Sequence, residues 1–274
     1  MVVPPNESNG EQSGERIARD APYWAPSVSR LSVSEVPADA VYLNVEGRQV
    51  VGPIQGFGKM WQKTYRVQLV GTAVTPAEVI TTWKERFADF WPRGNRFHAP
   101  LTGLAPGEVA LLSLTTPGRV KLSTGMFVLY ADDESFTLMT PQGHTFSGWI
   151  TFSAHNEPGG TVAQVQALMR ANDPVYEIGM TMMGHRRENA FWEATLGSLA
   201  KHFGLEQPEV ETRTICIDDR RQWSKAGNVR HNAFIRSGIY TVSVSLRRAM
   251  RPVRRIIVRL KERRTRELPS LPRE

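Results

Sequence analysis

Cysteine is nearly absent from this 274-residue chain, which contains only Cys216. A single cysteine excludes an internal disulfide and a cysteine-rich zinc cluster, and it suits a reducing compartment. Since Cys216 lies between two isoleucines, we interpret it as a small apolar side chain rather than a reactive thiol.

Long apolar runs are missing as well. No stretch of about 18 apolar residues occurs, so we expect no transmembrane helix. Residues 1–14 are polar and contain prolines, unlike the basic and then apolar start of a signal peptide. We therefore expect a cytoplasmic protein.

The common motifs of catalysis and metal binding are also missing. The chain has no Gly-x-Ser-x-Gly elbow, no His-Glu-x-x-His helix and no phosphate-binding loop, and Gly56-Phe57-Gly58 lacks the third glycine of a dinucleotide fingerprint. The six histidines show no pair at metal-ligand spacing on one predicted helix. We predict neither a metal site nor a cofactor.

Charge is unevenly distributed along the chain. Residues 1–212 contain 17 Lys and Arg against 22 Asp and Glu, whereas residues 213–274 contain 17 against 5. A mildly acidic body is thus followed by a strongly basic tail, which favours an anionic partner such as phospholipid or nucleic acid.

Composition divides the chain into three predicted parts. Residues 1–40 are rich in Pro, Ser, Glu and Ala and bury too little apolar surface to offset their ordering entropy, so we predict a disordered arm. Residues 41–205 are predicted as one folded domain that opens with one or two short strands. Residues 206–274 are predicted as a basic C-terminal extension.

Regular elements begin at residue 64. Apolar residues at alternate positions predict a strand over residues 64–70. Thr75-Pro76-Ala77-Glu78 then combines an N-cap, a proline at the first helical position and a capping-box glutamate, so a helix is expected to begin there. Its apolar residues recur at steps of three and four and predict one buried face: Ile80, Trp83, Phe87 and Phe90.

Six further strands are predicted between this helix and a second one. They cover residues 97–102, 108–115, 119–130, 136–140, 144–154 and 161–170, with turn residues between them. Their short spacing predicts a meander of antiparallel hairpins.

The second helix is predicted from Asp173-Pro174 to about Phe203, with Gly204 as its stop. One set of residues recurs at alternating steps of four and three: Ile178, Met182, His185, Asn189, Trp192, Leu196, Leu199 and Phe203. This spacing predicts one continuous stripe along the helix.

The order of strand, helix, six-strand meander and long helix, with its two proline-marked helix starts, resembles the START-like superfamily with the helix-grip fold. That superfamily includes polyketide cyclases, lipid-transfer domains and plant allergen-type ligand carriers. Residues 141–146 (Pro-Gln-Gly-His-Thr-Phe), followed by the long helix, also look like an uncharacterised actinobacterial branch. The resemblance implies an α+β fold in which a curved antiparallel sheet of about seven strands wraps around the long helix. It also implies a cavity that binds a hydrophobic small molecule.

We predict that six residues contact such a ligand: His144, Phe146, Tyr176, Met182, His185 and Asn189. His185 and Asn189 are polar at i and i+4 within an apolar stripe, so burying them requires either a ligand headgroup or partners within the protein. His144 shares strand parity with Phe146 at a hairpin end, where a surface turn is the alternative. Core filling is the alternative for Met182.

If its own side chains fill the cavity, the protein is instead a non-enzymatic adaptor that binds nucleic acid or membrane through its basic tail. Two kinds of function stay open for an empty cavity. One is carriage of a lipid-like or polyketide-like molecule. The other is a cyclase-type enzyme that shapes a reactive chain within the cavity and uses His185 as acid or base, since no nucleophile motif is present.

The basic tail carries its own predictions. Alternating residues 240–246 predict a strand, and residues 247–266 contain ten Lys and Arg against one acid, Glu262. We predict an amphipathic helix there whose arginines bind an anionic membrane surface: Arg247, Arg248, Arg251, Arg254, Arg255 and Arg259. Nucleic acid is the less favoured partner. The purely structural alternative, which the pattern fits at least as well, is a helix that packs its apolar stripe on its own domain and leaves its basic face in water. The oligomeric state does not follow from the sequence.

Overall fold

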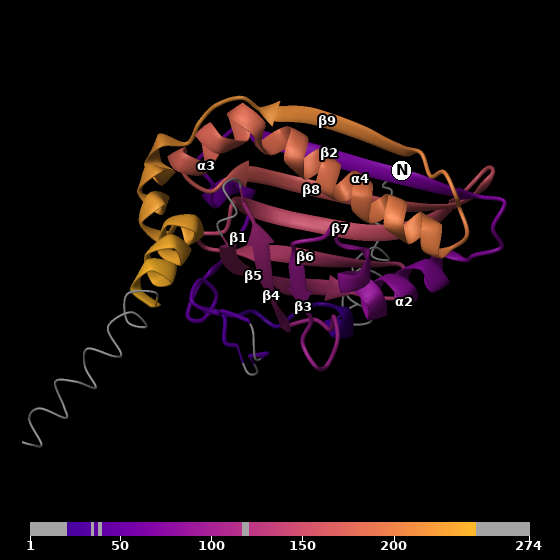
Figure 1. Ribbon diagram of the computed structural model, residues 1–274, viewed down its shortest axis with the longest axis horizontal. Helices are drawn as coiled ribbons and strands as arrows, with labels where there is room; N and C mark the ends of the chain where they lie inside the picture. Colours follow the sequence, from indigo (N-terminus) through magenta and orange to yellow (C-terminus); the bar gives the residue numbers. More distant parts are fainter. Residues whose placement is uncertain (1–20, 34–35, 38–39, 117–120, 245–274) are drawn as a thin grey trace, which may run out of the picture.

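A curved antiparallel sheet forms the body of the protein in the computed structural model, which describes residues 21–33, 36–37, 40–116 and 121–244 (Figure 1). The strands follow the order β3-β4-β5-β6-β7-β8-β2-β9, and the short strand β1 pairs with β6. Their bounds are β1 Val50–Val51, β2 Met60–Val70, β3 Arg96–His98, β4 Val109–Thr115, β5 Lys121–Ala131, β6 Ser135–Pro141, β7 Phe146–Glu157, β8 Gly160–Ala171 and β9 Val210–Asp218. The meander predicted over residues 97–170 is confirmed as β3 to β8.

Helices cover the concave face of this sheet. The helix α2 spans Pro76–Arg86 and continues into the 3₁₀ turn η3, Phe87–Phe90. After β8 come α3, Pro174–Gly179, a π-helical turn, Met180–Gly184, and α4, His185–His202. Figure 1 shows α4 crossing β2 and β8 obliquely. This arrangement confirms the predicted α+β helix-grip fold, in which the sheet embraces the long helix.

The start of α2 forms as its local sequence requires. Thr75 accepts a hydrogen bond on its Oγ1 from the N–H of Glu78, at 3.3 Å, and the Glu78 carboxylate accepts one from the N–H of Thr75, at 2.8 Å. This reciprocal capping box, with Pro76 at the first helical position, satisfies backbone donors that the helix itself cannot pair.

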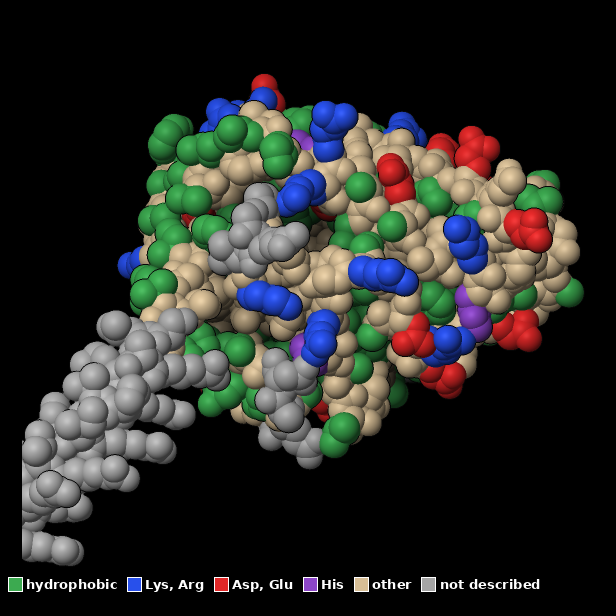
Figure 2. All heavy atoms as spheres, viewed as in Figure 1, with side chains coloured by type: hydrophobic (Ala, Val, Ile, Leu, Met, Phe, Trp, Pro, Cys, Tyr) green, Lys and Arg blue, Asp and Glu red, His purple; other side chains and the backbone are tan. Residues whose placement is uncertain are grey.

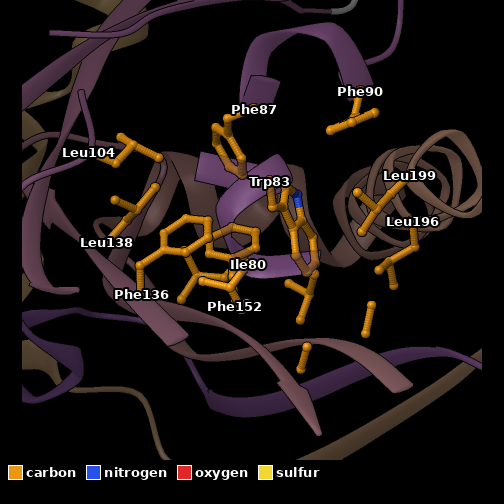
Figure 3. Packing of buried hydrophobic residues seen from close by; sticks show 14 of the residues in the cluster. Ile80, Trp83, Phe87, Phe90, Leu104, Phe136, Leu138, Phe152, Leu196 and Leu199 are labelled. Carbon is orange, nitrogen blue, oxygen red and sulfur yellow. The ribbon is translucent and has the colours of Figure 1, made fainter. Parts of the chain in front are cut away.

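Aromatic side chains fill the main core where α2 meets the sheet. Phe136 and Phe152 from neighbouring strands stack at 4.6 Å, and Trp83 meets Phe152 edge-on at 5.2 Å. Figure 3 shows Trp83 beside this pair, with Leu196 and Leu199 reaching in from α4. All five side chains are buried, so this end of the grip is packed solid.

A second, smaller core lies on the outer face of β4 and β5. Leu111 and Phe127 point outward from these strands and are covered by Leu31 and Val45. The backbone N–H of Ala25 also donates to the carbonyl of Leu129 at 2.8 Å. Residues 21–33 therefore differ from the disordered arm predicted for residues 1–40, because their few apolar residues meet an apolar sheet face.

The π-helical turn divides the predicted stripe of the long helix. A π turn holds more residues than an α turn, so it rotates the preceding segment relative to α4. Leu196 and Leu199 are fully buried as predicted, whereas Ile178 and Met182 are 63% and 75% exposed. The prediction of one continuous buried face thus holds for the C-terminal half of the helix only.

The chain after α4 returns to the sheet and then wraps around one end of it. β9 pairs antiparallel with β2, which the sequence did not predict, and the 3₁₀ segment η6, Trp223–His231, follows. Residues 233–244 are helical, and Asn232 caps them by accepting on its Oδ1 from the N–H of Ile235 at 3.0 Å. The strand predicted over residues 240–246 is therefore wrong for residues 240–244, because a capped helix overrides the alternating pattern.

The arginines predicted to bind an anionic surface, Arg247 to Arg259, lie outside the described residues. Within the part of the chain that is described, no helix has both the length and the apolar character needed to cross a membrane.

Candidate functional site

A cavity of about 660 Å³ lies between the concave face of the sheet and the segment from α3 to α4. Aromatic side chains line much of it: Phe87, Trp91, Phe146, Trp149, Phe191, Trp192 and Phe234. Leucine, isoleucine and methionine side chains supply most of the remaining wall, including Leu112, Leu138, Ile150, Met126, Met169, Met180 and Met183. The volume and the apolar wall are typical of a site for a hydrophobic small molecule.

Small residues explain why this end of the grip stays empty. Ala167 on β8 is buried and lines the cavity, as expected from the small inward residues of this strand. Across from it, the helix contributes Gly179 and Gly184 to the lining, and both flank or belong to the π-helical turn. Neither glycine can extend a side chain into the space, so the concavity is left unfilled.

His144 lies in the turn between β6 and β7 and lines the cavity, with only 5% of its surface exposed. Its Nδ1 accepts a hydrogen bond from the N–H of Phe146 at 3.1 Å. Burial lowers the pKa of His144 to about 4, so the ring is neutral at pH 7. With Nδ1 as the acceptor, the neutral ring carries its proton on Nε2. The surface-turn alternative for His144 does not hold.

Tyr176 on α3 lines the cavity next to the C-terminal segment. Its hydroxyl accepts a hydrogen bond from the N–H of Phe234 at 2.9 Å, and burial raises its pKa above the ordinary value. Phe234 belongs to the helix at residues 233–244 and forms part of the cavity wall. The end of the cavity is therefore closed by a segment far from the rest of the site in sequence.

Backbone contacts hold this closing segment against the turn that carries His144. The N–H of Ala233 donates to the carbonyl of Gly143 at 2.9 Å. Gly143 has a φ of +91°, and a side chain there would overlap the carbonyl of His231. Asn44 adds a buried link, since its amide donates to the Ser237 hydroxyl at 3.0 Å.

A buried ion pair stands beside the cavity. Glu188 on α4 lines the cavity and accepts a hydrogen bond on its Oε2 from the ammonium of Lys63 on β2, at 2.7 Å. Burial raises the pKa of the Glu188 carboxyl, and the charge of Lys63 opposes this rise. Glu188 is thus an acidic group in an otherwise apolar wall.

The other predicted ligand contacts lie away from this cavity. Asn189 accepts hydrogen bonds on its Oδ1 from Lys63 at 2.9 Å and from the hydroxyl of Tyr65 at 2.9 Å, so strand side chains satisfy it. His185 packs against the ring of Trp61 at 4.6 Å, and burial together with Lys63 lowers its pKa to about 4. Neither residue lines the cavity.

Met182 lines a smaller depression on the other side of the helix, together with Trp223 and Phe57. The structure therefore brings together His144, Phe146 and Tyr176 at one cavity, and it separates Met182, His185 and Asn189 from them. Ligand binding by all six residues stays a prediction.

Positive charge lies at the opening of the cavity. Arg187, next to Glu188 on α4, lines the cavity and is exposed to solvent. Figure 2 shows Lys and Arg side chains around a hollow near the middle of the viewed face. The wall thus changes from apolar inside to basic outside.

Glu188 and Phe234 are among the cavity-wall residues that the sequence analysis did not select. Glu188 is off the predicted stripe, which passes through its neighbour Asn189, although it lies one helical turn before Trp192 in α4. Phe234 lies in the predicted C-terminal extension, and no local pattern connects it to the meander. Among the described residues, no three His, Cys, Asp or Glu side chains are grouped so that they could hold a metal ion.

No family model and no curated protein matches this chain. Solved structures are similar to about half of it. The di-domain ARO/CYC StfQ from the steffimycin biosynthetic pathway is 14% identical over 53% of this chain and 51% of its own, with a TM-score of 0.42. A START superfamily protein from Mycobacterium smegmatis is 21% identical over 53% of this chain and 99% of its own, with a TM-score of 0.38. Ara h 8.0201 is 10% identical over 53% of this chain and 97% of its own, with a TM-score of 0.39.

Proposed function

We propose that the protein binds and carries a hydrophobic small molecule of lipid-like or polyketide-like character. The observation that carries this proposal is the apolar cavity of about 660 Å³, which falls within the range of roughly 300–1,000 Å³ typical of small-molecule sites. Burying an apolar ligand there removes its surface from water, which is the main favourable contribution to binding in such a site.

The cyclase alternative has less support. Its candidate acid or base, His185, packs on Trp61 beside the cavity rather than lining it. His144 does line the cavity, but its lowered pKa makes it a poor proton donor as an imidazolium at pH 7. Carriage therefore needs fewer assumptions than catalysis.

Native mass spectrometry of freshly purified full-length protein tests the proposal. We expect an excess mass of one small molecule that is released on denaturation. The variant Ala167→Phe should lose this mass, because its ring would occupy the cavity, and Ala190→Trp near the opening provides a second filling variant. Gln166→Phe, one residue away on the same strand, is the matched control. Equal retention in the two filling variants and in the control would contradict the proposal.

We also propose, as a second function, that the basic tail docks on anionic membranes. The helix at residues 233–244 leads into the arginine-rich segment and exposes Ile239 and Val242, at 65% and 68%. Apolar side chains next to a dense basic segment are typical of a membrane-surface element.

Sedimentation with vesicles tests this docking. Full-length protein should sediment with vesicles that contain phosphatidylserine and not with phosphatidylcholine alone, whereas a form ending at residue 244 should stay in solution with both. Equal sedimentation of the two forms would exclude the tail as the docking element, and equal binding to both vesicles would exclude the role of charge.

A further inference from the structure

Glu188 lines the cavity and has one carboxylate oxygen, Oε2, in a hydrogen bond. Its side chain is only 8% exposed, and Oε2 is bonded to Lys63 at 2.7 Å. Oε1 forms no hydrogen bond within the described residues, and Glu188 lines the cavity wall. Oε1 is not one of the fully buried side-chain atoms that lack a hydrogen bond within the described residues, so it is accessible at the cavity wall. A ligand that supplies a donor there forms a hydrogen bond to a charged acceptor and gains affinity.

Lys63 has no donor left for a ligand. Its ammonium donates to Glu188 Oε2 at 2.7 Å, to Asn189 Oδ1 at 2.9 Å and to the carbonyl of His185 at 3.4 Å. An ammonium has three donors, and these contacts use all of them. Lys63 is also completely buried and does not line the cavity. It therefore fixes Glu188 in place and does not offer a binding site for an anionic ligand.

His144 provides a second polar point on the same cavity wall. Its Nδ1 accepts from the N–H of Phe146, so in the neutral ring Nε2 carries a proton. Nε2 has no hydrogen-bond partner within the described residues. The ring is thus a donor available to a ligand oxygen, and it stands on the β6–β7 turn, whereas Glu188 stands on α4.

From these groups we propose that the cavity selects an uncharged apolar molecule that bears a hydroxyl group, which donates to Glu188 Oε1, and an oxygen acceptor for His144 Nε2. A ligand carboxylate at the Glu188 position would bring two like charges together where water is scarce, so fatty acids and other anions are disfavoured there. The exposed Arg187 at the opening can attract an anionic group only outside the apolar part. This selection rests on the proposed function, since it requires that the cavity binds a ligand at all.

Three probes with the same rings test this selection: naphthalene, 2-naphthol and 2-naphthoate. At pH 7 the phenol is un-ionised and the acid is a carboxylate. Titration calorimetry on the full-length protein should give 2-naphthol an affinity at least about tenfold above that of naphthalene, as expected for a hydrogen bond to a charged acceptor. The affinity of 2-naphthoate should be at least about tenfold below that of 2-naphthol.

The variant Glu188→Gln assigns the preference to this side chain. Its amide oxygen can still accept from Lys63, while the carboxylate charge is removed and the buried ammonium loses its counter-charge. We expect the preference for 2-naphthol over 2-naphthoate to shrink toward onefold with little change for naphthalene. Arg186→Gln, an exposed position on α4 that does not line the cavity, is the matched control and should keep the preference of the wild type for 2-naphthol over naphthalene.

The outcomes separate the two proposals. Equal binding of naphthalene and 2-naphthol by the wild type overturns the selection but leaves cavity binding intact, and this result needs no variant. A preference that is unchanged in Glu188→Gln overturns the role of Glu188. No binding of any of the three probes overturns both the selection and the proposed function.

Discussion

The two ends of the helix grip differ although one sheet and one long helix form both. At the end covered by α2, Trp83, Phe136 and Phe152 contact one another ring to ring and are fully buried. At the end covered by α3 and the π-helical turn, the small residues Ala167 and Gly179 both line the cavity of about 660 Å³. Side-chain size along the grip, rather than the course of the backbone, thus decides where the interior is open.

The two ends of the grip also have different roles, because one stabilises the fold and the other leaves room for a ligand. The filled end supplies the dense packing that stabilises the fold, whereas residues at the open end contact fewer atoms and are free to accommodate a ligand. Methionines are concentrated at the open end, where Met180 and Met183 line the cavity, and flexible thioethers adapt to varied apolar shapes.

The largest expected effect is a difference in stability between one side-chain truncation at the filled end and one at the open end. Trp83→Ala removes a fully buried indole and should lower the free energy of unfolding by about 3–5 kcal/mol. Met183→Ala at the open end removes a side chain that is 50% exposed and should cost less than about 1 kcal/mol. Urea denaturation followed by circular dichroism measures both values. Similar losses of unfolding free energy in the two variants would mean that the filled end does not contribute more to stability than the open end.

Acid should weaken the open end through His144. Its pKa of about 4 in the folded protein is below the ordinary 6.5, so the unfolded chain takes up a proton more readily. The stability that this neutral ring contributes is fully present above pH 6.5 and is lost as the pH falls from 6.5 toward 4. Between pH 7.5 and 4.5 this loss amounts to about 2–3 kcal/mol.

The variant His144→Asn isolates this effect, because it keeps an acceptor for the N–H of Phe146 but does not titrate. Its unfolding free energy should fall less over the same pH interval than that of the wild type. His155→Asn, an exposed position on β7, is the control and should follow the wild type. A slope for His144→Asn equal to that of the wild type would exclude His144 as the titrating group.

The smallest effect is expected where the C-terminal segment closes the cavity. Phe234→Ala should remove part of the wall and speed the release of a neutral dye such as Nile red by about threefold or more, while stability changes little. Stopped-flow fluorescence measures the release rate. Ile235→Ala, the next residue on the same helix, does not line the cavity and should leave the rate unchanged. Equal rates in both variants would show that this segment does not limit exit.

Local signals were enough to predict much of the fold. The capping box at Thr75, the proline after Asp173 and the turn residues between β3 and β8 each act over a few residues, so they can be recognised without knowledge of the rest of the chain. Parity along the strand also led to two cavity residues, His144 and Phe146, and Tyr176, another predicted ligand contact, lines the cavity too.

The remaining features depend on contacts that are distant in sequence. The π turn at residues 180–184 changes which residues of the helix face the cavity, and a stripe counted at an α-helical period could not include that rotation. Glu188 needs Lys63, more than a hundred residues earlier, as its partner. Phe234 reaches the cavity only because Gly143 and Asn44 hold the returning chain.

The position of β2 in the sheet means that this strand can pair only late in synthesis. β2 occupies an inner position, yet its two neighbours are β8 and β9, which begin at residues 160 and 210. During synthesis from the N-terminus, the backbone N–H and C=O groups of β2 therefore stay unpaired until most of the described chain has left the ribosome. Slow, late closure around this strand exposes it to pairing with other nascent chains, a hazard that chaperones limit in cells.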